Sequence, residues 1–131
     1  MRERSLSIII IDDDFAVTVT SANMLDDMGY DVAVSGDGYR AIEIMRWNAY
    51  DVALMDIEMP GINGVEIFRQ VKRISPLTKV MMMTACSEGS LVREALKEGA
   101  FSILYKPLDF DKVLYFIEKA EKNFNPAIVR F

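Results

Sequence analysis

The stretch Leu6-Ser7-Ile8-Ile9-Ile10-Ile11, with Asp12-Asp13-Asp14 directly after it, decides the fold class of this chain. The first six residues are almost continuously apolar and mostly β-branched, whereas a half-exposed strand alternates apolar and polar positions. Such a run is typical of a strand buried on both faces of a parallel sheet. Similar runs follow at 31–35, 52–55, 79–83 and 101–105, and the second is shorter and more edge-like.

A segment with apolar residues at helical spacing follows each run. The first such segment covers 15–28 and ends at Gly29, a residue that commonly terminates helices. Further helices are expected at 39–47, 64–74, 88–98 and 110–123. The alternation of strand and helix predicts an α/β fold, a (βα)5 three-layer sandwich with a parallel five-stranded sheet. We expect one domain over 1–123 and a short C-terminal tail or linker stub over 124–131.

The composition excludes several classes of protein and of site. A chain of 131 residues suits one domain with a hydrophobic core of its own. The net charge of −5 argues against direct nucleic acid binding and against an anionic membrane surface as partner. One cysteine and no histidine rule out an intramolecular disulfide and histidine-based metal sites. No apolar stretch approaches the roughly 20 residues that span a bilayer, and we expect a cytoplasmic protein.

Polar residues that can do chemistry follow four of the expected strands. The strand ends carry, in chain order, Asp12-Asp13-Asp14, Asp56, Thr84-Ala85 and Lys106-Pro107. Ligands of open α/β sheets bind at the carboxyl ends of the strands, near the point where the strand order reverses. We therefore expect these side chains to meet at one edge of the sheet. Any one of the motifs alone would suit a helix cap or a turn, so this prediction depends on their joint placement.

Carboxylates that are brought together repel one another, so this edge needs positive charge. Mg²⁺ binds one or two carboxylates, keeps several waters and binds phosphate oxygens. A carboxylate such as Asp56 can act as a nucleophile and form an aspartyl phosphate. The oxygens of a transferring phosphoryl group need cations and hydrogen-bond donors around them, which Mg²⁺, Lys106 and the Thr84 hydroxyl can supply.

Three further segments, together with 8–14, carry a resemblance to a known family. They are Leu54-Met55-Asp56-Ile57-Glu58-Met59-Pro60-Gly61-Ile62-Asn63-Gly64, Met81-Met82-Met83-Thr84-Ala85 and the segment from Gly99-Ala100 to Tyr105-Lys106-Pro107-Leu108. From residue 6 to about residue 123, the chain resembles the receiver domain of two-component response regulators. The resemblance implies a flavodoxin-like sheet of strand order 2-1-3-4-5. It also implies a phosphoryl donor that is a histidine kinase or a histidine phosphotransfer protein, and a signalling domain that catalyses only its own phosphorylation and dephosphorylation.

The same resemblance implies roles for individual residues. By position, Asp56 resembles the phosphoacceptor, Thr84 the switch hydroxyl and Lys106 the lysine that pairs with the phosphoryl oxygens. Ala85 is small, as access to the phosphoryl group requires. The bond between Lys106 and Pro107 is expected to be cis, which would aim the lysine inward.

A Mg²⁺ or Mn²⁺ site is implied at the same edge. Asp12 and Asp13 resemble the acidic pair, with Asp13 as the direct ligand and Asp12 acting through water. Asp56 and the backbone carbonyl of Glu58 would complete the site. Asp14 fits either a third acidic position or a helix cap. The side chains of Glu58 and Cys86 flank the site and could tune the lifetime of the phosphoryl group.

One position departs from the family pattern. Many receivers carry Tyr or Phe three residues before the lysine, and this chain has Ile103 there. Tyr105 lies two residues further on and shares the same side of the strand, but the resemblance does not make it the switch. The output stays open: either an unknown partner docks on the domain, with homodimer formation on phosphorylation as one form, or an output domain is missing.

The sequence is also compatible with two other functions. The first is a phosphatase of the haloacid-dehalogenase type, which shares the strand-end aspartate, Mg²⁺ and lysine. That family has an Asp-x-Asp motif on its first strand, which Asp12-Asp13-Asp14 fits by spacing, but no cap domain is evident here. The second is a receiver-like interaction module that never takes phosphate, against which the intact set Asp56, Thr84 and Lys106 argues.

Overall fold

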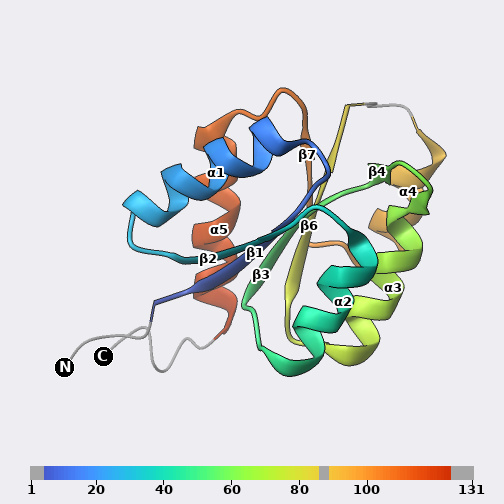
Figure 1. The fold of residues 1–131 in the computed structure, drawn as a ribbon, viewed down its shortest axis with the longest axis horizontal. Coiled ribbons are helices and arrows are strands. Elements are labelled where there is room, and N and C mark those ends of the chain that lie inside the picture. The colour runs from blue at the N-terminus through green and yellow to red at the C-terminus, as the bar shows by residue number, and fades with distance from the viewer. Residues whose placement is uncertain (1–4, 86–88, 125–131) are drawn as a thin grey trace.

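A computed structural model describes residues 5–85 and 89–124, and its middle layer is a parallel five-stranded sheet (Figure 1). The strands are β1 (Ser7–Ile11), β2 (Asp31–Ser35), β3 (Val52–Asp56), β6 (Lys79–Thr84) and β7 (Ser102–Tyr105). They lie in the order β2-β1-β3-β6-β7. Counted within this sheet, that is the predicted order 2-1-3-4-5, and the prediction is confirmed. The strand order reverses between β1 and β3.

Helices cover both faces of the sheet, as predicted. On one face lie α1 (Phe15–Asp27) and α5 (Phe110–Phe124), and on the other lie α2 (Gly38–Trp47), α3 (Gly64–Ile74) and α4 (Ser90–Lys97) (Figure 1). The expected helix at 88–98 is shorter, and residue 88 lies outside the described residues, as do 125–131 of the expected tail. Among the described helices, none has both the length and the apolar character needed to cross a membrane.

The isoleucines of β1 explain why its sequence is apolar without alternation. Ile8 and Ile10 pack in the core beneath α1 and α5, while Ile9 and Ile11 pack in the core beneath α2, α3 and α4. All four side chains have no exposed surface. Successive side chains of a strand point to opposite faces, so a strand with a core on each side needs apolar residues at every position. Burial of each such side chain stabilises the fold by roughly 1.5–3 kcal/mol.

A small antiparallel hairpin follows β3 and was not predicted. Its strands are β4 (Glu58–Met59) and β5 (Ile62–Asn63), joined by a turn in which Gly61 has a φ of 71°. The hairpin leads directly into α3, whose first turn is capped by Asn63: its side-chain oxygen accepts a hydrogen bond from the N–H of Val65 at 2.9 Å. The hairpin therefore gives an ordered path to the segment between Asp56, at the carboxyl edge of the sheet, and α3.

Candidate functional site

The carboxyl ends of four parallel strands bring the predicted side chains together. The ammonium group of Lys106, which directly follows β7, donates to Asp12 Oδ2 at 2.6 Å and to Asp56 Oδ2 at 3.2 Å. Asp12 follows β1 and Asp56 ends β3, so one lysine joins the ends of three strands. Asp12 and Asp56 are both buried, with 1% and 6% of their surface exposed. The expected convergence of residues distant in sequence is thus found.

The three consecutive aspartates after β1 occupy different environments. Asp12 Oδ1 accepts a hydrogen bond from the N–H of Asp14 at 2.9 Å, which holds the turn between β1 and α1. Asp14 is the N-cap of α1, because its Oδ1 accepts from the N–H groups of Ala16 and Val17. Of the two readings of Asp14 left open by the sequence, the structure supports the helix cap. Asp13 is exposed and free to face a ligand at the edge.

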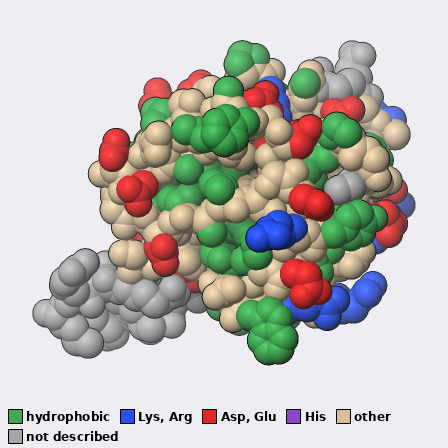
Figure 2. All heavy atoms as spheres, viewed as in Figure 1, with side chains coloured by type: hydrophobic (Ala, Val, Ile, Leu, Met, Phe, Trp, Pro, Cys, Tyr) green, Lys and Arg blue, Asp and Glu red, His purple; other side chains and the backbone are tan. Residues whose placement is uncertain are grey.

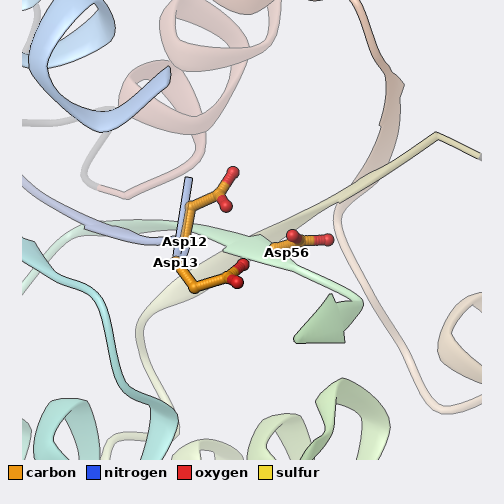
Figure 3. A group of neighbouring side chains, drawn as sticks. All are labelled: Asp12, Asp13 and Asp56. Carbon is orange, nitrogen blue, oxygen red and sulfur yellow. The ribbon is translucent and has the colours of Figure 1, made fainter. Parts of the chain in front are cut away.

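The carboxylates of Asp12, Asp13 and Asp56 form a group that can hold a metal ion. One oxygen from each lies within 4.8 Å of the others, and Figure 3 shows Asp12 and Asp13 at the end of β1 beside Asp56 at the end of β3. Elsewhere, acidic side chains are spread over the face that Figure 2 shows, among basic and hydrophobic ones. Carboxylate oxygens are the ligands that Mg²⁺ and Mn²⁺ prefer, and the exposed position of Asp13 leaves room for the water molecules that such an ion keeps. The residues therefore fit the expected metal.

The negative charge of an ionised Asp56 is only partly compensated by its neighbours. Burial raises the pKa of the Asp56 carboxyl; the Glu58 N–H and Lys106 oppose this and Asp12 adds to it, so the pKa stays above its ordinary value. For Lys106, burial alone would lower the pKa, but the hydrogen bond to Asp12 and the two carboxylate charges raise it. The Lys106 side chain is thus stabilised in its charged form, and its ammonium lies closer to Asp12 than to Asp56. A divalent ion would supply the compensation that Asp56 lacks.

Thr84 ends β6 with no exposed surface, and its hydroxyl contacts a residue of the hairpin. The hydroxyl donates to Glu58 Oε1 at 3.0 Å. The N–H of Glu58 donates in turn to Asp56 Oδ1 at 3.0 Å. Glu58 therefore touches Asp56 through its backbone and Thr84 through its side chain. The sequence pointed to the Glu58 carbonyl and to its side chain near the site, but not to this hydrogen bond with Thr84.

The remaining predicted positions lie around this core. Ile103 is partly buried against the cluster beneath α2, α3 and α4, and Tyr105 on the same side of β7 is 48% exposed. Ala85 is exposed directly after Thr84. The Lys106–Pro107 bond is cis, as predicted. Cys86, the other flanking residue, lies outside the described residues.

The family model of the response regulator receiver domain matches residues 8–118 of this chain. Over 120 residues the chain is 35% identical to the transcriptional regulatory protein ZraR of Escherichia coli strain K12, which is 92% of this chain but 27% of that protein. The chain thus spans about a quarter of the length of this curated relative.

Other similar proteins match over nearly their whole length. Sporulation initiation phosphotransferase F of Bacillus subtilis strain 168 is 29% identical over 112 residues, which is 86% of this chain and 90% of that protein. The solved structure of a response regulator receiver domain protein from Clostridium thermocellum is 26% identical, with a TM-score of 0.83 over 96% of this chain and 99% of that chain.

Proposed function

We propose that this chain, which belongs to the family of response regulator receiver domains, accepts a phosphoryl group on the carboxylate of Asp56. The observation that carries the proposal is the position of Lys106, whose ammonium contacts both Asp12 and Asp56 at the carboxyl edge of the sheet. Asp56 is a buried carboxylate whose negative charge is incompletely compensated, which suits a nucleophile that must attack an anionic phosphoryl group.

In the proposed reaction, a carboxylate oxygen of Asp56 attacks the phosphorus of a phosphohistidine. The new Asp56 O–P bond forms as the P–N bond breaks, and the imidazole of the donor leaves with the electron pair. Lys106 lies 3.2 Å from Asp56 Oδ2 and can pair with the oxygens of the transferred group. A Mg²⁺ ion held by Asp12, Asp13, Asp56 and the carbonyl of Glu58 would neutralise further charge on these oxygens.

The partners follow from the same chemistry. Receiver domains take their phosphoryl group from histidine kinases or histidine phosphotransfer proteins, and we infer such a donor for this chain in the cytoplasm. The domain over 1–123 would catalyse its own phosphorylation and dephosphorylation. Its output would be a change in the binding of a partner, of a second copy of the chain or of a further domain.

Labelling with a small phosphoryl donor tests this function. Phosphoramidate or acetyl phosphate with Mg²⁺ is expected to add one phosphoryl group per chain, measured by intact-mass spectrometry. The alternative of a phosphatase predicts steady release of inorganic phosphate from small phosphate esters. Such turnover, or an unlabelled chain, would contradict the receiver function proposed here.

Replacement of Asp13 tests the metal site. Asp13→Asn is expected to weaken Mg²⁺ binding by at least about tenfold, because even residues around the direct ligands of metal sites contribute that much. Isothermal titration calorimetry measures the affinity directly. Asp14→Asn is the matched control, because it removes one charge from the same turn while asparagine still caps α1. Equal affinities of the two variants would remove Asp13 from the ligand set.

A further inference from the structure

Glu58 connects Asp56 and Thr84 in the unmodified protein. The backbone of Glu58 is held by the β4–β5 pairing and by its N–H bond to Asp56 Oδ1, while its carboxylate accepts the hydrogen bond of the Thr84 hydroxyl. The side chain of Glu58 is otherwise exposed, so it can leave Thr84 while its backbone stays in place. This residue adds a negative charge at the edge that already holds Asp12, Asp13 and Asp56.

We propose that Glu58 is a positioning residue. Its carboxylate holds the Thr84 hydroxyl away from the phosphoryl site, and so opposes the movement of this hydroxyl toward Asp56 until Asp56 is phosphorylated. The inference rests on the proposed function, since it concerns the response of Thr84 to a phosphoryl group on Asp56.

Two physical effects oppose this hydrogen bond once Asp56 is phosphorylated. A hydroxyl has one proton, so Thr84 can donate to Glu58 or to a phosphoryl oxygen, but not to both. A phosphoryl group on Asp56 also adds negative charge beside the N–H of Glu58, and like charges so close repel the Glu58 carboxylate. The bond that stabilises the unmodified state is thus weakened by the modification itself.

The structure offers room for the exchange. A hollow of about 200 Å³ lies beside Glu58 and Thr84, bounded by Ile57 and by the first turn of α4 at Ser90, Leu91 and Val92. Glu58 is exposed, so its side chain can turn into this space without displacing the core. Residues at the start of α4 line the same hollow as Thr84.

The affinity for beryllofluoride in the presence of Mg²⁺ tests the proposal, because this anion mimics a phosphoryl group on an aspartate. Glu58→Ala is expected to bind it about tenfold more tightly than the wild type, since a hydrogen bond to a charged acceptor no longer has to be broken. Glu58→Gln, which keeps a neutral acceptor, is expected to lie between the two. Affinities are measured by titration followed by NMR spectroscopy.

Two further measurements distinguish positioning from a general effect of charge. In a Thr84→Ala background, the gain from Glu58→Ala is expected to be several-fold smaller, because no hydroxyl remains to be released. In the free Glu58→Ala protein, the Thr84 methyl resonance is expected to move toward its position in the beryllofluoride-bound wild type. Glu118→Ala, which removes a charge near Tyr30 at the opposite edge of the sheet, is expected to bind like the wild type.

The possible outcomes separate this inference from the function on which it rests. A wild type that binds no beryllofluoride would overturn both. A wild type that binds it, with Glu58→Ala no tighter, would leave the receiver function intact and overturn the role of Glu58. An equal gain with and without the Thr84 hydroxyl would also overturn it, because the effect would then be one of charge alone.

Discussion

Asp56→Ala is expected to abolish phosphoryl labelling of the chain by phosphoramidate and Mg²⁺. Asp56 is the carboxylate that ends β3, lies 3.2 Å from the Lys106 ammonium and contributes an oxygen to the predicted metal group. Alanine removes the nucleophile, so no aspartyl phosphate can form at this position. Intact-mass spectrometry of both proteins under the same conditions measures the effect as the labelled fraction.

The matched control is Asp31→Ala. Asp31 is exposed at the first position of β2, on the opposite edge of the sheet, so this variant loses the same side chain far from the site. It is expected to be labelled like the wild type. Equal labelling of Asp56→Ala and the wild type would show that the phosphoacceptor is a residue other than Asp56.

The same position tests the electrostatic argument through stability. The folded state raises the pKa of Asp56 above its unfolded value, so the group favours folding at low pH, and this contribution is lost as the pH rises through the folded pKa. Without Mg²⁺, ionisation of the Asp56 carboxyl therefore lowers the stability of the folded state. Asp56→Asn, which removes the charge and keeps the shape, is expected to raise the melting temperature in metal-free buffer, as measured by circular dichroism.

The sequence could predict the sheet and the meeting of its strand ends because both depend on local pattern. The run from Ile8 to Ile11 has apolar residues facing each side, which only a doubly covered strand requires. Once β1, β3 and β7 are parallel strands of one sheet, the residues that follow them share its carboxyl edge. The positions of Asp12, Asp56 and Lys106 follow from topology rather than from side-chain detail.

The features missed by sequence reasoning depend on contacts of another kind. The β4–β5 hairpin has two residues in each strand, too few for an alternating pattern to appear. The hydrogen bond from Thr84 to Glu58 joins side chains 26 positions apart, and it depends on a rotamer and on the path of that hairpin. No spacing within the chain encodes such a bond, although the position of Glu58 two residues after Asp56 places it near the site.

The largest expected loss of stability comes from Gly64→Ala. Gly64 begins α3, and a Cβ atom there would lie 2.4 Å from the carbonyl oxygen of Ile57 and 2.6 Å from its Cα. These are backbone atoms, so no side chain can turn aside to relieve the contact. Ile57 is itself fixed, because its N–H donates to Met83 O at 2.8 Å and its carbonyl accepts from Gly64 N at 3.0 Å.

Accommodation of the methyl group therefore requires α3 and the chain after Asp56 to move apart. We expect a loss of at least about 3 kcal/mol in the free energy of unfolding, at the upper end of the usual cost of overpacking. For a domain of this size that corresponds to a fall in melting temperature of roughly 10 °C or more. Labelling of Asp56 is expected to fall as well, since Ile57 directly follows it.

Alanine substitutions at two other glycines near this edge serve as controls, because they add the same methyl group without a close contact to backbone atoms. At Gly36 the nearest atom to an added Cβ is Asp12 O at 3.8 Å, an ordinary contact, so Gly36→Ala is expected to be nearly neutral. At Gly61 nothing lies within 4 Å, but its φ of 71° makes alanine unfavourable by about 1 kcal/mol. If Gly64→Ala melts no lower than Gly61→Ala, the close packing of α3 on Ile57 does not hold the loop beside Asp56. Ile57 directly follows Asp56, and Gly64 begins α3. The order of the three melting temperatures therefore tests whether the contact between Ile57 and Gly64 holds Asp56 in position.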